Sequence, residues 1–341
     1  MILVISYPND YHTKVVLAEL DKLNVAVSLL DLSQFPQHMQ VEAQYDSNGQ
    51  HNYFLHLSDS TQLDLTMCSA IWWRRAQPFL LHPEIQNPTN YAFAYSETSE
   101  AFSGLWLSLD AFWVNHPTRD ADSHHKLHQL RIAQEVGLTI PETLITNNPD
   151  RALEFVKRYE SEGTIYKAFT GTQEAWRETR LLKENELALI DSVRYAPVIF
   201  QRYVEAQFDL RITVVGEDIF PAAIFSQESS YKIDFRMDMS NTKITAHQLP
   251  SDVEERLHAL MQRLGIIYGA IDMRLTPTGQ YVFLEVNPAG QWLFVEEKSG
   301  QPISKCLAHL LATHANDSQR IYDKTLFKQT NHQIKAQPPD R

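Results

Sequence analysis

The 341-residue chain is longer than one ordinary hydrophobic core supports, so we expect two or three domains. Hydrophobic residues make up 43% and charged residues 21% of the chain, which is typical of a soluble globular protein, and no apolar run approaches the length of a transmembrane helix. The net charge of −12 argues against broad nucleic-acid binding, which needs a basic surface, although it permits a local anion site.

The cysteines and the N-terminus indicate the compartment. Cys68 and Cys306 lie far apart and form neither a disulfide framework nor a metal motif. The chain opens directly as a strand without a basic segment before it, so we expect no signal peptide. A cytoplasmic protein with no membrane partner is the expectation that follows.

Strand and helix signals alternate through residues 1–115. Apolar runs predict strands at 2–6, 27–32, 70–73 and 112–114, and helical spacing predicts helices at 13–23 and 96–108. A turn at 46–49 predicts a hairpin within 44–64. We therefore expect an N-terminal α/β domain with a mostly parallel sheet.

Residues 116–200 form the second predicted domain. Its helix at 123–136 ends at Gly137, and a second helix begins with Asn148 as N-cap and Pro149 as its first residue. Extended segments are predicted at 139–145, 164–169 and 197–204.

Residues 201–315 form the third predicted domain. It begins with a hairpin of strands 209–215 and 219–225. Ser251-Asp-Val-Glu254 predicts a capping box that opens a helix ending at Gly265, and a last amphipathic helix carries Ile303 and Leu311. Residues 316–341 are polar and without periodicity, so we expect a flexible tail.

A second hairpin in this domain contains oxygen ligands for a metal. Two apolar runs, 268–275 and 281–287, flank a turn at 277–279. Glu285 and Asn287 are two residues apart, so on a strand their side chains point to the same face. If Asp272 faces them from the partner strand, the three side chains suit Mg²⁺ bound to nucleotide phosphates.

Several cations precede this hairpin along the chain. Lys167 lies in the middle of an apolar strand, where a lysine is costly unless it meets an anion, although it could lie on the solvent face. Lys126 lies in the first turn of a helix, where the partial positive charge also favours a phosphate. With Arg211, Arg236 and Arg274 these residues predict a polyphosphate site.

The segment Gln201-Arg202-Tyr203-Val204 ends a strand and is followed by acidic residues. Backbone groups there could bind an adenine edge, and Asp209 could hold ribose hydroxyls. Arg211 shares a face with Asp209, so an internal ion pair between them is an equally good interpretation.

Two further motifs admit ordinary explanations. His124 and His128 would share a helix face beside His125, but zinc needs another ligand at suitable spacing and the sequence offers none. Trp72-Trp73-Arg74-Arg75 could contact a substrate, or could place one buried and one exposed tryptophan at a strand end.

Together the motifs resemble the ATP-grasp superfamily over about residues 116–312. They follow that family's order: Lys126 in His-Lys-Leu, Lys167, 201–204, Asp209-Leu-Arg211, Asp234-Phe-Arg236, Ala270-Ile-Asp272 and Leu284-Glu-Val-Asn287. Within it the chain resembles the ribosomal-protein glutamate ligases and, more closely, the graspetide macrocyclases that make microviridin-type peptides. The closest likeness lies in Trp73-Arg74-Arg75, in 201–225 and in 287–294.

The resemblance implies an ATP-grasp fold of two α+β subdomains that grip ATP, preceded by the N-terminal α/β domain. It implies that a peptide carboxylate is activated as an acyl phosphate and joined to a side-chain hydroxyl or amine. The implied cofactors are ATP and Mg²⁺, and the implied partner is a precursor peptide, with a homodimer left open and no nucleic acid.

The same resemblance implies roles for individual residues. Asp272, Glu285 and Asn287 would hold Mg²⁺. Lys126, Lys167 and Arg236 would hold phosphates, and Gln201–Val204 with Asp209 would hold adenosine, through Arg202 and Val204 backbone groups and the ribose. Arg211 would lie beside the acyl phosphate, and Arg274 is a second candidate that could equally brace Asp272.

Two positions depart from the family pattern. The loop after Lys167 usually contains several glycines, and here 170–172 contain one. Many relatives have Glu where Arg202 stands, which a backbone contact tolerates. A small-molecule or protein-tail carboxylate–amine ligase is the runner-up, and a non-catalytic nucleotide-binding regulator is the alternative of another class.

Overall fold

The computed structural model describes residues 1–169, 180–228 and 242–316. The chain forms two compact units, one made of Met1–Thr118 with the residues from Ser304 on, and the other of Arg119–Ile303. The predicted domain boundaries at residues 115, 200 and 315 stay a prediction.

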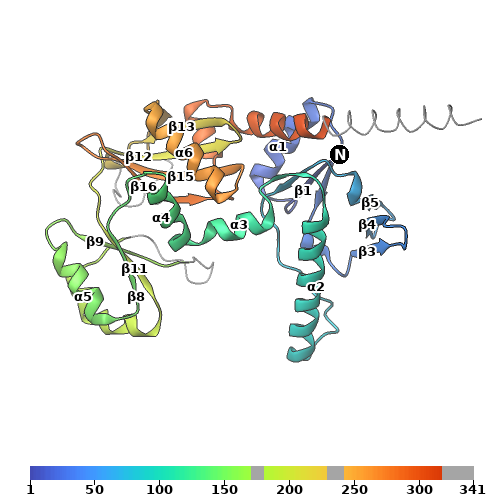
Figure 1. Ribbon diagram of the computed structural model, residues 1–341, viewed down its shortest axis with the longest axis horizontal. Coiled ribbons are helices and arrows are strands. Elements are labelled where there is room, and N and C mark those ends of the chain that lie inside the picture. Colours follow the sequence, from blue (N-terminus) through green and yellow to red (C-terminus); the bar gives the residue numbers. More distant parts are fainter. Residues whose placement is uncertain (170–179, 229–241, 317–341) are drawn as a thin grey trace, which may run out of the picture. The chain divides into compact units, whose positions relative to one another are not determined.

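The N-terminal unit is built on a parallel sheet of strand order β2-β1-β6-β7. A separate antiparallel sheet, β3-β4-β5, contains the predicted hairpin. The elements are β1 (Ile2–Ile5), α1 (Tyr11–Lys22), β2 (Val27–Leu30), β3 (Met39–Tyr45), β4 (His51–Leu57), β5 (Gln62–Asp64), β6 (Ala70–Trp73), α2 (Pro88–Ser108) and β7 (Phe112–Val114). A helix over residues 303–316 runs beside α1 (Figure 1).

Local signals start the helices of this unit. Asp10 caps α1 by accepting a hydrogen bond from the Thr13 N–H, and Asn87 caps α2 with Pro88 as its first residue. One face of the parallel sheet packs against α2 through Phe102, Trp106 and their apolar neighbours. The predicted parallel α/β domain is therefore confirmed.

The second unit begins with α3 (Pro117–His124), whose first two residues precede the boundary between the units, and α4 (Lys126–Glu135). Its smaller sheet is antiparallel with strand order β10-β9-β11-β8 and packs against α5 through a core around Phe155 and Phe200. The elements are β8 (Thr143–Thr146), α5 (Pro149–Arg158), β9 (Thr164–Lys167), β10 (Arg180–Leu181), the 3₁₀ helix η3 (Glu184–Tyr195) and β11 (Val198–Arg202).

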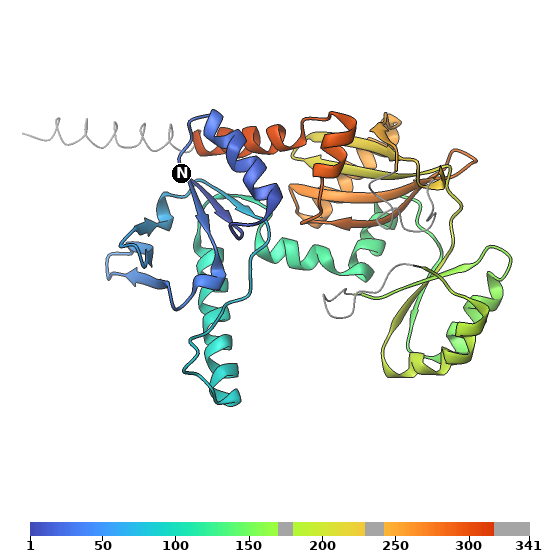
Figure 2. The ribbon, with the colours of Figure 1, turned by 180° about the vertical axis from the view of Figure 1, so that it is seen from behind.

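The larger sheet of the second unit is antiparallel, with strand order β14-β13-β12-β15-β16. Its elements are β12 (Phe208–Val215), β13 (Asp218–Ile224), β14 (Ile244–Ala246), α6 (Ser251–Leu264), β15 (Tyr268–Leu275), β16 (Tyr281–Asn287) and α7 (Leu293–Ser299). One face packs against α4 and α6 through Ile132, Leu257, Leu260 and the buried strand residues. Figure 1 shows α6 over the strands, and Figure 2 shows the strands from the other side.

The structure differs from the sequence-based predictions at two helix starts. The predicted capping box is wrong, because Pro250 is the N-cap of α6 and Ser251 is already helical. The predicted helix over 123–136 is broken at His125, whose extended backbone (φ −74°, ψ 110°) separates α3 from α4. The predicted tail lies almost wholly outside the described residues. No helix in the described ranges is long and apolar enough to cross a membrane.

Candidate active site

The hairpin of β15 and β16 brings its oxygen side chains together by means of a β-bulge. Asp272 lies opposite Glu285, whereas the next residue, Met273, lies opposite Phe283, so Leu284 has no direct opposite. Met273 and Phe283 are buried in the core. The bulge therefore lets two apolar residues fill the core while the adjacent Asp272 and Glu285 share the other face.

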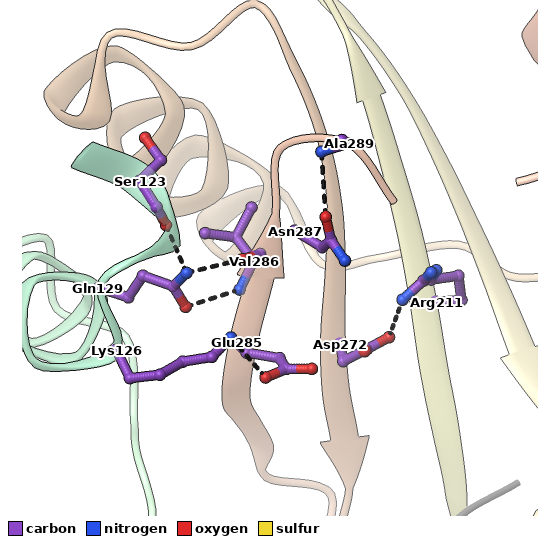
Figure 3. A network of polar contacts seen from close by, with 9 residues as sticks. All are labelled: Ser123, Lys126, Gln129, Arg211, Asp272, Glu285, Val286, Asn287 and Ala289. Atoms are coloured by element: carbon purple, nitrogen blue, oxygen red, sulfur yellow. Dashed lines mark hydrogen bonds and ion pairs between the residues drawn. The ribbon is translucent and has the colours of Figure 1, made fainter. Parts of the chain in front are cut away.

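Each of the three predicted metal ligands is already oriented by a neighbour (Figure 3). Lys126 Nζ donates to Glu285 Oε2 at 2.7 Å, and Arg211 Nη1 donates to Asp272 Oδ1 at 2.7 Å. The Ala289 N–H donates to Asn287 Oδ1 at 3.0 Å. In Figure 3 the Asp272 and Glu285 side chains lie next to one another, between the two cations. The three residues are thus brought together as predicted.

Lys126 reaches this hairpin because the chain breaks at His125. The break makes Lys126 the first residue of α4, and its side chain is about three-quarters buried against Glu285. A lysine at a helix N-terminus is disfavoured by the helix dipole, so the contact with a carboxylate offsets a local cost. The predicted position of Lys126 in a first helical turn is confirmed.

Lys167 ends β9 and is partly buried. Burial lowers the pKa of Lys167, Glu285 opposes this effect, and the positive charges of Lys126 and Arg274 lower the pKa further. No hydrogen bond or ion pair to its ammonium group occurs among the described residues. The choice between a solvent face and an anion site for Lys167 stays a prediction, and the surrounding charges favour an anion beside this group.

A quartet of charges lies on the same sheet, at the two central strands β12 and β15. Arg211 lies opposite Asp272, and Asp209 lies opposite Arg274, so the ion pairs run across the strands and not along them. We call Asp209, Arg211, Asp272 and Arg274 the sheet quartet. The predicted internal pair of Asp209 with Arg211 is not formed, because residues directly opposite across strands are closer than neighbours two apart on one strand.

Arg211 uses its guanidinium within the protein. Besides Asp272, its Nη2 donates to the Gln291 carbonyl oxygen at 3.1 Å, and the group lies 5.8 Å from the centre of the Phe294 ring. The Nε atom is buried without a hydrogen-bond partner in the part of the chain that the structure describes. Arg211 thus contacts a predicted metal ligand directly.

The predicted adenine segment joins β11 to β12. The Gln201 side chain is buried and donates to Thr143 Oγ1 at 3.0 Å. The N–H groups of Arg202 and Tyr203 donate to the carbonyl oxygens of Glu142 and Gly163, both at 2.9 Å. Arg236 and the 170–172 loop lie outside the described residues.

The sequence did not reveal Gln129, which supports the metal strand. Its buried side chain donates through Nε2 to the Val286 carbonyl at 2.7 Å and accepts from the Val286 N–H at 3.1 Å (Figure 3). Because β16 is an edge strand, this amide takes the place of a neighbouring strand at the peptide between Glu285 and Asn287. In the sequence, the one indication of this role was a glutamine at a position where the helix otherwise presents apolar residues to the core.

Gly290 was also missed. A Cβ atom there would lie 2.4 Å from the Ala270 Cβ, so the turn after Asn287 can approach β15 only with glycine. The Tyr268 hydroxyl donates to the Gly290 carbonyl at 2.8 Å and holds the turn in place.

Two other motifs have structural partners. His124 Nδ1 lies 3.2 Å from Asp120 Oδ2, and this hydrogen bond raises the pKa of His124. His124 ends α3 and His128 belongs to α4, so they do not share one continuous helix face. In the N-terminal unit Trp72 is buried, whereas Trp73 is partly buried against the core and not exposed as one of the two interpretations predicts.

The residues present fit Mg²⁺ and a nucleotide. Facing strands supply two carboxylates and one amide oxygen, which is the oxygen-rich set that Mg²⁺ prefers. Lys126 and Lys167 lie close enough to this set for their charges to interact with each other and with Glu285. Such a cluster of cations beside carboxylates suits a metal-bound polyphosphate.

Comparison with known proteins decides the family. A RiPP-associated ATP-grasp ligase of Chryseobacterium gregarium, solved in complex with ADP and a leader and core peptide, is 30% identical with a TM-score of 0.83. The alignment covers 92% of this chain and 96% of that one. The chain belongs to the ATP-grasp ligases.

Other relatives of this ATP-grasp ligase agree. A family model described as the MvdD pre-ATP grasp domain matches residues 1–121. The macrocyclase MdnC of Microcystis aeruginosa MRC, bound with precursor peptide MdnA, is 29% identical with a TM-score of 0.81, over 92% of this chain and 99% of that one. A ribosomal protein bS6–L-glutamate ligase of Salmonella paratyphi B is 25% identical over 61% of this chain and 69% of that protein. ATP-grasp ligases use ATP and Mg²⁺.

Proposed function

We propose that this ATP-grasp ligase activates a side-chain carboxylate of a peptide as an acyl phosphate and joins it to a side-chain hydroxyl or amine, which closes a macrocycle. The carboxylate oxygen attacks the γ-phosphorus and ADP leaves. The hydroxyl or amine then attacks the acyl carbon, loses its proton, and inorganic phosphate leaves. The peptide therefore loses one water for each ring.

The observation that carries the proposal is the convergence of Lys126, Lys167, Asp272 and Glu285 from four different elements, α4, β9, β15 and β16. A carboxylate is a poor electrophile, so phosphorylation must supply the leaving group. The cluster places oxygen ligands for a metal next to cations, and a metal-bound polyphosphate needs both. The chain resembles, over nearly its whole length, ligases that were solved with bound peptides, and this likeness supports a peptide as substrate.

The proposal assigns each side chain a task. Asp272, Glu285 and Asn287 would hold Mg²⁺, which when bound neutralises phosphate charge. Lys126 and Lys167, with Arg236, would bind the phosphates. Arg211, whose guanidinium donates to Asp272 and to the Gln291 carbonyl, would lie beside the acyl phosphate and keep that metal ligand in place.

Mass spectrometry tests this directly. The protein is incubated with ATP, Mg²⁺ and a short peptide encoded beside its gene that carries Thr or Ser and Asp or Glu. We expect ATP-dependent loss of one water per ring, with ADP and phosphate as products. Transfer of ¹⁸O from the peptide carboxylate into phosphate is also expected. AMP and pyrophosphate would instead mean adenylation and would overturn the mechanism.

A glutamate-ligase-type activity is the second candidate, and the relationship to the bS6–L-glutamate ligase favours it. It predicts a mass gain when a free amino acid is added to a protein tail or small carboxylate. The two functions are separated by one measurement, because water loss without an added amino acid marks a macrocyclase. Nucleotide binding without any turnover would instead indicate a regulator.

A further inference from the structure

We propose that Arg274 and Asp209 form a positioning pair, which fixes the Tyr203–Val204 backbone at the adenosine end of the site and contacts neither the nucleotide nor the substrate. The inference rests on the proposed function, because it assumes that the adenosine of ATP binds beside this backbone. It also gives Asp209 and Arg274 different tasks from those that the family resemblance implies.

The guanidinium of Arg274 is occupied by the protein. Its Nε donates to Asp209 Oδ1 at 2.8 Å, and its Nη1 donates to the Val204 carbonyl oxygen at 2.7 Å. Its carbon lies 5.3 Å from the centre of the Tyr203 ring, which is within the range of a cation–π contact. One arginine therefore holds both residues of the segment and a carboxylate.

Burial argues against direct ligand contacts for this pair. The side chains of Arg274 and Asp209 are each only 6% exposed. At Asp209 Oδ1 a ribose hydroxyl, and at Arg274 a substrate carboxylate, would have to displace a charge-assisted hydrogen bond from a water-poor position, which is costly. A supporting task needs no such displacement.

The strand pairing explains what the support achieves. Arg274 lies on β15 two residues after Asp272, on the same face of the strand. The crossover from Tyr203 into β12 is also tied to β15 by the Gln207 N–H, which donates to the Leu275 carbonyl at 2.7 Å. The strand that carries a metal ligand thus also fixes the adenosine segment, so the two ends of the nucleotide site keep a constant spacing.

Nucleotide affinities test the pair in the full-length protein. Arg274→Lys keeps the charge but loses the fork, and Asp209→Asn keeps an acceptor but loses the charge. We expect each variant to weaken ATP, 2′-deoxy-ATP and AMP by the same factor, about tenfold, in calorimetric titrations. Binding of Mg²⁺-tripolyphosphate should not change. The double variant should be no weaker than the weaker single variant, because Asp209 acts on the segment only through Arg274.

Hydrogen exchange supplies a readout that does not depend on a ligand. In the ligand-free protein, a peptide covering residues 203–207 should exchange faster in both variants than in the wild type, while the β1 peptide should not. Arg263→Lys on α6 is the matched control, because that arginine pairs with Glu135 at a more exposed position. Its affinities and exchange should equal those of the wild type.

Three results would overturn the inference. Loss of the preference for ATP over 2′-deoxy-ATP in Asp209→Asn alone would make Asp209 a ribose ligand. Unchanged nucleotide binding with weakened peptide binding in Arg274→Lys would make Arg274 a substrate ligand. If residues 203–207 exchanged at the wild-type rate in both variants, the pair would not stabilise this backbone. A wild-type protein that binds no ATP would instead refute the proposed function.

Discussion

Groups of aspartate and arginine that are buried or partly buried occur in both units of the molecule, and they are built differently. In the sheet quartet, arginine nitrogens approach carboxylate oxygens at 2.7 and 2.8 Å across paired strands. In the N-terminal unit, Asp10 lies 3.6 Å from Arg74 Nε and 3.8 Å from Arg75 Nη1. The carboxylate of Asp10 instead accepts hydrogen bonds from the N–H and the hydroxyl of Thr13, at 2.8 and 2.9 Å.

The difference shows what each carboxylate is for. Asp10 is the N-cap of α1, so its shortest contacts are local, and its two arginines add ion pairs that are longer than those of the quartet. The quartet carboxylates are held by residues more than sixty positions away in sequence. We infer that the N-terminal group maintains a helix start, whereas the quartet and its neighbours set the geometry of a reaction site. Substitutions in the two groups should therefore differ in their effects on turnover and on stability.

Glu285→Gln should reduce ATP-dependent turnover by far more than tenfold, because a neutral amide weakens Mg²⁺ binding without changing shape. Turnover and thermal unfolding are measured in the same preparation, with Glu135→Gln as the exposed control. Asp10→Asn should instead lower stability more than turnover. If Glu285→Gln kept more than about a tenth of wild-type turnover, a barrier change below ~1.4 kcal/mol, the metal assignment would fail.

Arg211→Lys should impair ring formation far more than ATP binding. Lysine keeps the charge but cannot contact Asp272 and the Gln291 carbonyl together as a fork does, so the geometry beside the acyl phosphate should change. Dehydration of the peptide and ATP affinity are measured together, with Arg75→Lys in the N-terminal group as the matched comparison. Normal dehydration would remove Arg211 from the mechanism, and an equal loss of ATP affinity would make it a nucleotide ligand.

Lys167→Ala should weaken ATP binding more than AMP binding. The lost charge-assisted contact is worth ~1.5–3 kcal/mol and concerns phosphates that AMP lacks. Titrations with both nucleotides provide the measurement, and Lys157→Ala on α5 serves as a control. Equal weakening for ATP and AMP would indicate an adenosine contact or a general packing defect.

Gln129→Leu should lower the free energy of unfolding by about 1–3 kcal/mol, since both polar groups of the buried Val286 peptide lose their partner. Chemical denaturation measures this, and the exposed Gln134→Leu on the same helix is the control. The affinity for Mg²⁺-ATP should fall as well, because the peptide lies between Glu285 and Asn287. Wild-type stability and affinity together would show that β16 needs no such support.

Asp10→Asn should show the smallest effect, and one that depends on pH. Burial raises the pKa of Asp10, but the Arg74 charge and the Thr13 hydrogen bonds outweigh it, so the folded-state pKa lies below the ordinary value. Its contribution to stability is therefore present above the unfolded-state pKa of about 4 and is lost as the pH falls through the folded-state value. The stability difference between wild type and variant should be constant near neutral pH and shrink in acid. A difference that grew in acid would contradict the sign of this shift.

Local sequence determined much of this protein. Apolar runs separated by turn residues predicted the β12–β13 and β15–β16 hairpins, because a strand and its turn are specified within about twenty residues. Asn148 and Pro149 predicted the start of α5 for the same reason. Spacing of two residues also placed Glu285 and Asn287 on one face before any partner was known.

Only the tertiary structure decided which groups meet across those elements. The bulge at Leu284 placed Glu285 opposite Asp272, and the register of β12 against β15 paired Arg211 with Asp272 and Asp209 with Arg274. Gln129 forms hydrogen bonds with the backbone of Val286, which is 157 residues away in sequence. The break at His125 places Lys126 where its side chain contacts Glu285. Ion pairs and amide contacts depend on distances of a few ångströms between chain segments, and periodicity along one segment carries no information about its neighbour's register. The residue types of the site were thus readable from the sequence, whereas their partners followed from packing.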